Sequence, residues 1–272
     1  MTQPIRPQRV NHMNVVLQDF DASIAHWRRL FDAEFMADMP QREFHAGLIA
    51  IGRVIFEIFV PHDFLLNARY GPHYLGVEYQ ADMDAVRAAV AAHGIRIVRD
   101  IGLALHTHPA DCLGVSFEFY GGYFHDRDWP PLGGKMKPAA YWRDEHKLGL
   151  TGLTGYTIAV HDIDKAARFL QSFLGASAVY EAPQPAIAAR SLGLQVADAI
   201  IELVTPLGEG PLQRHLHQCG EGIRSTVFGV RDMGQAQRYF AEHGVALVPG
   251  AAPGSTALPA ALNLGMLFEF RE

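Results

Sequence analysis

The sequence predicts an α+β protein built from four copies of a strand–helix–three-strand unit, βαβββ. The first observation behind this prediction is a glutamate that recurs inside a short apolar strand, at Glu57, Glu118, Glu202 and Glu269. The second is that the two halves of the chain match each other at offsets of 143 to 151 residues. Offsets this constant indicate a tandem duplication, in which each half holds two of the units.

The first unit is expected to contain a strand at 9–17, a helix from about 19 to 31, and two strands near 43–51 and 53–60. In the first strand, alternation places His12, Asn14 and Val16 on one face. Asp19 offers N-cap chemistry for the helix, whose apolar residues recur at helical spacing. The last strand carries Glu57, so the unit ends on the repeated glutamate.

The second unit is expected to contain a strand at 73–79, a helix from about 82 to 92, and strands at 95–98 and 112–120. Gly94 follows the helix, in a position that helix ends favour. The last strand carries Glu118. Residues 121–150 are rich in glycine, proline and aromatic residues and indicate a loop and linker.

From Leu153 onward the same two units return. Glu202 stands 145 residues after Glu57, and Glu269 stands 151 residues after Glu118. We therefore predict a first domain at 1–126, a linker at 127–150 that includes Trp129, and a second domain at 151–272.

Composition limits the classes of function. The 272 residues are 49% hydrophobic and 19% charged, which is typical of a globular protein with a sizeable core. The formal net charge of −6 comes without a basic patch, which argues against nucleic acid or an anionic membrane as a partner. Two cysteines give no disulfide framework, and no apolar run reaches membrane-spanning length, so a cytoplasmic protein is expected.

Four βαβββ units, paired two by two, resemble the vicinal oxygen chelate superfamily. This superfamily includes glyoxalase I, methylmalonyl-CoA epimerase, extradiol dioxygenases and bleomycin- or fosfomycin-resistance proteins. The resemblance is carried by the repeat and covers nearly the whole chain except the linker. It implies two cupped sheets of mixed and antiparallel strands with the helices outside. It also implies metal ligands on the first and last strands of each unit, and it suggests a homodimer.

The resemblance places metal ligands of this sequence at His12, Glu57 and Glu118. The corresponding count in the second unit falls on Leu75, which is not a ligand. His73 lies two residues earlier on the same strand face and is expected in its place. Histidines and carboxylates together suit a divalent transition metal, which here means Ni²⁺, Zn²⁺, Co²⁺, Mn²⁺ or Fe²⁺.

The second half departs from this pattern. Its first-strand positions hold Gly155 and Ser225, which cannot ligate in the same way. Glu202 and Glu269 remain, so we expect a duplicated scaffold without a metal of its own. The sequence leaves open which units share the working cup. They are either the first and second, or the first and fourth, in which case His12 faces Glu269.

Three functions follow from the resemblance as alternatives. The first is a metal-dependent lyase or isomerase of the glyoxalase or epimerase type, in which Glu57 or Glu118 moves a proton while the metal stabilises an enediolate or enolate. The second is an Fe(II) extradiol dioxygenase that uses His12, His73 and Glu118. The third is a resistance-type protein that binds a small molecule without catalysis. In each case the partner is a small molecule.

Some of these residues also have structural alternatives. Glu57 and Glu118 would be structural if each paired with an arginine, such as Arg53 or Arg96. His106 and His108 form a His-x-His pair before the strand of Glu118. Such a pair in a loop is more often solvated than part of a site.

Overall fold

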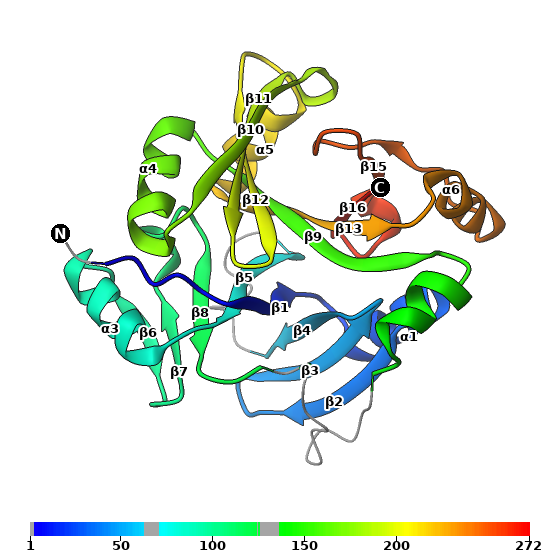
Figure 1. Cartoon of the computed structure of the whole chain (residues 1–272). Helices are drawn as coiled ribbons and strands as arrows, with labels where there is room; N and C mark the ends of the chain where they lie inside the picture. Colours follow the sequence, from blue (N-terminus) through cyan, green and yellow to red (C-terminus); the bar gives the residue numbers. More distant parts are fainter. Residues whose placement is uncertain (1–2, 63–70, 124, 126–135) are drawn as a thin grey trace. The chain divides into compact units, whose positions relative to one another are not determined.

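The strands form two eight-stranded mixed sheets, and each sheet takes its strands from one half of the chain (Figure 1). The structure is a computed structural model that describes residues 3–62, 71–123, 125 and 136–272. Residues 127–135 of the predicted linker, which include Trp129, lie outside the described residues.

The first sheet has the strand order β2-β3-β4-β1-β5-β8-β7-β6. Its strands are β1 (Arg9–Val16), β2 (Glu34–Pro40), β3 (Phe44–Ile51), β4 (Val54–Pro61), β5 (His73–Gln80), β6 (Ile97–Asp100), β7 (Ala104–Thr107) and β8 (Ser116–Tyr120).

The second sheet repeats this order as β10-β11-β12-β9-β13-β16-β15-β14. Its strands are β9 (Leu150–Ala159), β10 (Ser177–Gln184), β11 (Ala189–Val196), β12 (Ala199–Pro206), β13 (Gly222–Val230), β14 (Val248–Pro249), β15 (Thr256–Leu258) and β16 (Leu267–Arg271).

Within each βαβββ unit the first strand pairs in parallel with the last. β1 pairs with β4, β5 with β8, β9 with β12 and β13 with β16. The remaining pairs described within each unit are antiparallel hairpins. The predicted α+β fold of four βαβββ units is therefore confirmed.

The helices begin where the sequence offers a cap. The described α-helices are α1 (Phe20–Phe31), α3 (Met83–Ala92), α4 (Ile163–Leu174), α5 (Pro211–Cys219) and α6 (Met233–Glu242). Asp19 accepts a hydrogen bond from the backbone N–H of Ala22, and Asp82, Asp162 and Asp232 cap their helices in the same way. The four helices that start each unit thus share one acidic cap, as the repeat predicts.

The turn between β3 and β4 fixes the register of Glu57. Gly52 and Arg53 have φ angles of 55° and 74°, the left-handed pair that a tight two-residue hairpin requires. The turn falls between the two strands predicted near 43–51 and 53–60. It aligns β3 with β4 so that Glu57 stands opposite Leu48.

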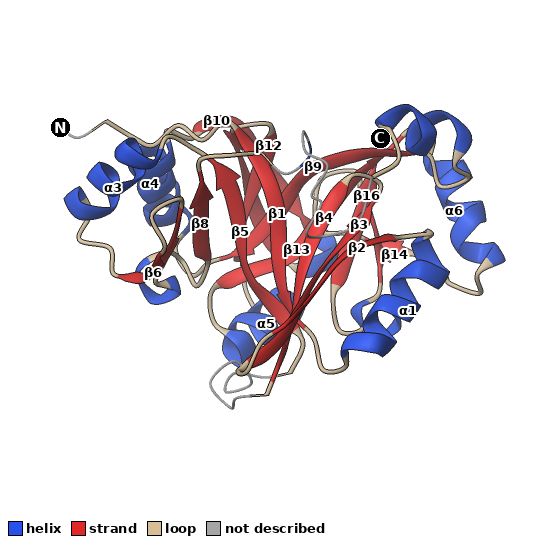
Figure 2. Ribbon diagram, turned by 90° about the horizontal axis from the view of Figure 1, so that it is seen from below, coloured by secondary structure: helices blue, strands red, loops and turns tan. Residues whose placement is uncertain are grey.

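One compact part of the structure consists of Met1–Asn11, Leu75–Tyr123 and Gly155–Arg224. In this part α3 lies beside α4 (Figure 2). His93, which follows α3, contacts the ring of Phe173, and its Nε2 lies 3.2 Å from the hydroxyl of Ser172. The hydroxyls of Tyr79 and Tyr156 share a buried 2.7 Å hydrogen bond.

The other compact part consists of His12–Tyr74, Phe124–Thr154 and Ser225–Glu272. In this part α1 lies beside α6 (Figure 2). Phe31 of α1 contacts Phe240 of α6, with the ring centroids 6.1 Å apart. The ring of Trp27 packs against that of Phe268, and its indole N–H donates a hydrogen bond to Oδ1 of Asn263 at 2.9 Å. The first unit therefore shares its sheet with the second unit and its aromatic core with the fourth. The boundaries predicted for the two domains stay a prediction.

β2, β7 and α5 were not predicted individually, and neither were β10 and β15, which correspond to β2 and β7 in the second half. No helix among the described residues is long and apolar enough to cross a membrane.

Candidate metal centre

The sheet formed by β1 and β4 separates an apolar face from a polar one. Met13 and Val15 are fully buried in the core, so His12 and Asn14 lie on the opposite face by alternation. In the parallel ladder Asn14 pairs with Glu57. Nε2 of His12 lies 3.3 Å from Oε2 of Glu57. His12 is buried, whereas the side chain of Glu57 keeps 19% of its surface exposed.

β5 and β8 place two further carboxylates side by side. Glu78 and Glu118 are partners in the parallel ladder and therefore lie on the same face. Their neighbours Val77, Phe117 and Phe119 are fully buried on the core side. Glu78 and Glu118 are themselves only 2% and 6% exposed. Two buried carboxylates at one register repel each other unless a proton or a cation compensates them.

His12, Glu78 and Glu118 form a group of buried side chains in which one possible ligand atom from each lies within 4.8 Å of the others. An imidazole nitrogen and two carboxylate oxygens at such distances are the donors that a divalent transition metal takes. This group could hold a metal.

His106 joins this group from β7. Its Cα partner in the antiparallel ladder is Glu118, and its Nε2 lies 3.0 Å from Oε1 of Glu118. His108 serves a different purpose, because its Nδ1 accepts from the backbone N–H of Ala110 and caps a short 3-10 turn. Of the two histidines in the His-x-His pair, only His106 therefore contacts a site residue.

The structure brings together some of the residues predicted from the sequence. His12 and Glu118 are in the three-residue group, and Glu57 contacts His12. His73 is not in the group. Its Nδ1 lies 2.7 Å from the carbonyl oxygen of Gly71, and the alternation of β5 places it on the face opposite Glu78. Its role as a ligand stays a prediction.

Arg96 does not pair with Glu118. Its guanidinium binds Asp111 instead, at 2.8 Å.

Glu78 is the residue that the sequence argument missed. The count used for the second unit landed on Leu75, but the register places Gly76 opposite Ser116, with Glu78 two residues further on the same face. A Cβ added at Gly76 would lie 1.9 Å from the carbonyl oxygen of Ser116, so that position holds no side chain. The signal was present in the sequence, since Glu78 is a fifth glutamate inside an apolar strand.

An apolar cluster borders His12. Ile55 is the ladder partner of His12, and it packs in one cluster with neighbouring strands. The buried members of this cluster are Met36, Ala37, Leu48, Ala50 and Ile55, with Met39 and Met136 packed against them. The cluster is buried and lies on the same face as His12, so it excludes water from that side of the imidazole.

In the second half the corresponding carboxylates are held by protein donors. Glu269 is fully buried and accepts hydrogen bonds from the hydroxyls of Ser225 and Ser255, at 2.7 and 2.6 Å. It also accepts from the backbone N–H groups of Ala251 and Ala252, both at 2.8 Å. The buried charge is thus satisfied without a metal.

Glu202 is bound in a comparable way, because Oε2 accepts from the hydroxyl of Tyr180 at 3.0 Å. The Tyr180 ring reaches it across Gly193, where any side chain would collide with the ring.

Gly155 takes the place of His12 in the second half, opposite Ile200. A Cβ added there would lie 2.2 Å from the carbonyl oxygen of Ile200. β9 therefore lies too close to β12 for a side chain at this point.

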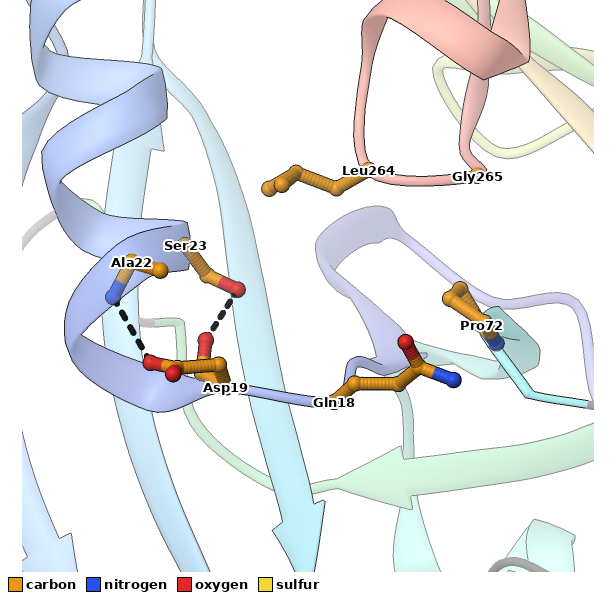
Figure 3. Close-up of a pocket in the computed structure, with 7 residues that line it drawn as sticks. All are labelled: Gln18, Asp19, Ala22, Ser23, Pro72, Leu264 and Gly265. Atoms are coloured by element: carbon orange, nitrogen blue, oxygen red, sulfur yellow. Dashed lines mark hydrogen bonds between the residues drawn. The ribbon is translucent and has the colours of Figure 1, made fainter.

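A separate cavity of about 290 Å³ lies at the start of α1 (Figure 3). It is lined by Gln18, Asp19, Ala22, Ser23, Pro72, Leu264 and Gly265. Its acidic group is engaged in the helix cap, where Asp19 accepts from the N–H of Ala22 at 2.9 Å. None of the candidate ligands lines this cavity.

Comparison with known proteins supports the fold of the chain and relates its second half to a family. Residues 152–256 match the model of the Glyoxalase/Bleomycin resistance protein/Dioxygenase superfamily. No curated protein matches the chain.

Among solved structures, a variant of 4-hydroxymandelate synthase from Streptomyces coelicolor has a TM-score of 0.76 at 11% identity, over 97% of this chain and 92% of that one. The Mn(II)-bound glyoxalase from Novosphingobium aromaticivorans has a TM-score of 0.65 at 12% identity, over 98% of this chain and 82% of that one. Methylmalonyl-CoA epimerase from Mycobacterium tuberculosis matches 44% of this chain and 87% of its own length, at 28% identity and a TM-score of 0.42. Residues 152–256 thus match the glyoxalase/bleomycin resistance/dioxygenase superfamily in sequence, and the chain as a whole shares its fold with the synthase and the glyoxalase.

Proposed function

We propose that the chain is a metal-dependent enzyme that moves a proton on a small substrate with two neighbouring oxygen atoms, as glyoxalases and epimerases do. The observation that carries the proposal is the buried group of His12, Glu78 and Glu118. Together, the two carboxylates bring two negative charges to an interior position. A divalent cation neutralises both of them.

The donor set fits such a cation. One imidazole nitrogen and two carboxylate oxygens are an intermediate set that Mn²⁺, Fe²⁺, Co²⁺, Ni²⁺ and Zn²⁺ all accept, so the residues alone do not select the metal. When bound, the metal would act as a Lewis acid that stabilises negative charge on a substrate oxygen. His106 holds Glu118 in position through the 3.0 Å contact between Nε2 and Oε1.

We assign the proton transfer to Glu57. Its carboxylate lies 3.3 Å from Nε2 of His12, it is partly exposed, and it is outside the ligand group. A carboxylate beside the centre can accept a proton from a substrate carbon and return it as general acid and base. The apolar cluster around Ile55 keeps bulk water from the same face.

We prefer proton transfer to extradiol ring cleavage as the function because of the side chains that would bind the metal. The dioxygenase alternative requires two histidines and one carboxylate. The group described above has one histidine and two carboxylates, and His73 is not among them. The expectations of a small-molecule substrate, a homodimer and a cytoplasmic location belong to this proposal as well.

The test is hydrogen exchange in D₂O. Wild-type protein loaded in turn with Mn²⁺, Zn²⁺, Co²⁺ and Ni²⁺ is incubated with hydroxyacetone and related small α-hydroxyketones, and loss of the α-proton signal is followed by NMR. We expect metal-dependent exchange that slows by about 100-fold or more in Glu57→Gln, which keeps its metal. Glu202→Gln, at the corresponding position of the second half, is the matched control and should leave exchange unchanged.

The same preparations separate the alternatives. Oxygen uptake with catechol after loading with Fe²⁺ would show that the protein cleaves rings as a dioxygenase and does not act by proton transfer. Absence of metal binding altogether would leave a ligand-binding protein of the resistance type.

A further inference from the structure

The polar face around Glu118 extends as a row across four neighbouring strands, β6, β7, β8 and β5. Arg99 pairs with His106, His106 with Glu118, and Glu118 with Glu78. Residues opposite each other on adjacent strands point to the same side of a sheet. Arg99 therefore lies on the face of the candidate site, at the outer end of the row.

A β-bulge places the arginine there. Ile97 pairs with Thr107 and Arg99 with His106, so Val98 is the extra residue on β6. Without the bulge, Val98 would stand opposite His106 and Arg99 would face the other side. Bulges commonly redirect a side chain next to a functional site.

The charge of Arg99 is not used by a neighbouring acid. Arg96 binds Asp111 at 2.8 Å, and Arg87 binds Asp100 at 3.2 Å, so both acidic residues near β6 are occupied. Within the part of the chain that the structure describes, Arg99 has no ion pair. Exposure rises along the row, from buried Glu118 through partly exposed His106 to exposed Arg99. The row thus leads from the buried carboxylates to solvent and ends on the guanidinium group of Arg99.

We propose that Arg99 binds a carboxylate on the substrate and so selects anionic vicinal-oxygen compounds; this inference rests on the proposed metal centre. The guanidinium group matches a carboxylate with two parallel hydrogen bonds. Adjacent strands are about 4.8 Å apart, which puts the backbone of Arg99 roughly 10 Å from that of Glu118. An extended arginine side chain and a small aromatic acid together span that distance.

The second half lacks this row. Its corresponding ladder pairs are Val248 with Ala257, Ala257 with Glu269, and Glu269 with Val227. Apolar residues thus replace the arginine, the histidine and the second glutamate. Arg99 is thus present in the half that also has the ligand group, as expected if the arginine and the metal act on one substrate.

The experiment compares two chelating probes on protein loaded with Zn²⁺, which is inert to oxidation. Catechol offers two neighbouring oxygens without charge, and 3,4-dihydroxybenzoate offers the same oxygens with a carboxylate. Binding is measured by calorimetry for wild type, Arg99→Gln, Arg99→Lys and Arg168→Gln, and Zn²⁺ content is measured for each. Arg168 is an exposed arginine on α4, outside the row, and serves as the control.

We expect wild type to bind 3,4-dihydroxybenzoate roughly tenfold or more tightly than catechol. Arg99→Gln should abolish that preference with Zn²⁺ content and catechol binding unchanged, Arg99→Lys should restore part of it, and Arg168→Gln should behave as wild type. Equal affinity for both probes in zinc-loaded wild type, or an undiminished preference in Arg99→Gln, would overturn the role of Arg99 and leave the metal centre standing. Failure of the wild type to take up Zn²⁺ would overturn the metal centre, and the role of Arg99 with it.

Discussion

The two halves of this chain carry the same glutamate in the same place, yet they surround it differently. Glu118 stands beside Glu78, another buried acid, and contacts the imidazole of His106. Glu269 stands beside Val227 and accepts hydrogen bonds from two serine hydroxyls and two backbone N–H groups. A glutamate in a strand is therefore not by itself evidence for a metal. The donors that already satisfy it decide its role.

The first strands of the two halves, β1 and β9, also differ in whether they can supply a metal ligand. β1 offers His12 to the polar face, whereas β9 has Gly155 at the corresponding position, where the carbonyl oxygen of Ile200 leaves no room for a side chain. The second half therefore differs by more than a ligand, because the backbone of Ile200 occupies the space that a side chain at Gly155 would need.

The largest effect is expected when the first half is made to resemble the second. His12→Ala removes the only imidazole of the ligand group, and the affinity for Zn²⁺ or Mn²⁺ should fall by about 100-fold or more, since even residues behind a ligand matter by 10- to 100-fold. Calorimetric metal titration measures it. An unchanged affinity would mean that the metal, if any, is bound elsewhere.

The reverse exchange should fail. Gly155→His should not create a metal site in the second half, because its Cβ would collide with the carbonyl oxygen of Ile200. We expect a loss of about 2–3 kcal/mol in the free energy of unfolding in urea, with metal stoichiometry unchanged. A gain of one metal per chain would show that the second half is a dormant site rather than a closed one.

The second half also has a pH dependence of its own. Burial on α5, and then the charge of Arg224, lower the pKa of His215 to about 4. The folded state therefore binds fewer protons than the unfolded state between pH 6.5 and 4. The stability contribution is complete above pH 6.5 and is lost as the pH falls toward 4, by roughly 3 kcal/mol. Urea unfolding across this range should show a slope that His215→Gln reduces. Parallel curves for both proteins would remove His215 as the cause.

The smallest effect concerns the donor to Glu202. Tyr180→Phe deletes the hydroxyl that binds Oε2 at 3.0 Å, and we expect a loss of about 1 kcal/mol in unfolding free energy. Metal content and hydrogen exchange on α-hydroxyketones should not change. A loss of metal in this variant would contradict the assignment of the carboxylates in the second half to structure.

The repeat made most of the fold predictable. Similar offsets between the halves predicted four equivalent units, and the shared acidic caps predicted where their helices begin. β2 was missed because its sequence has little alternation and ends on Pro40 at the edge of the sheet. α5 was missed because a proline opens it in place of a side-chain cap.

The site was only partly predictable. The resemblance to a known superfamily implied His12, Glu57 and Glu118, and the structure places Glu57 next to His12. Glu78 depends on the register between β5 and β8, which a count of residues from the helix cap does not determine. The position of Arg99 depends on a one-residue bulge, which no local sequence signal announces.

The most direct test of the account is metal binding by matched variants of the two halves. Glu118→Gln and Glu269→Gln remove the same carboxylate from corresponding strands, and each is titrated with Zn²⁺ and unfolded in urea. We predict that Glu118→Gln loses the metal while the metal-free protein keeps its stability. We predict that Glu269→Gln keeps one metal per chain and loses about 3 kcal/mol of unfolding free energy, because its four donors lose their acceptor charge. Full metal content in Glu118→Gln, or loss of metal in a folded Glu269→Gln, would contradict it.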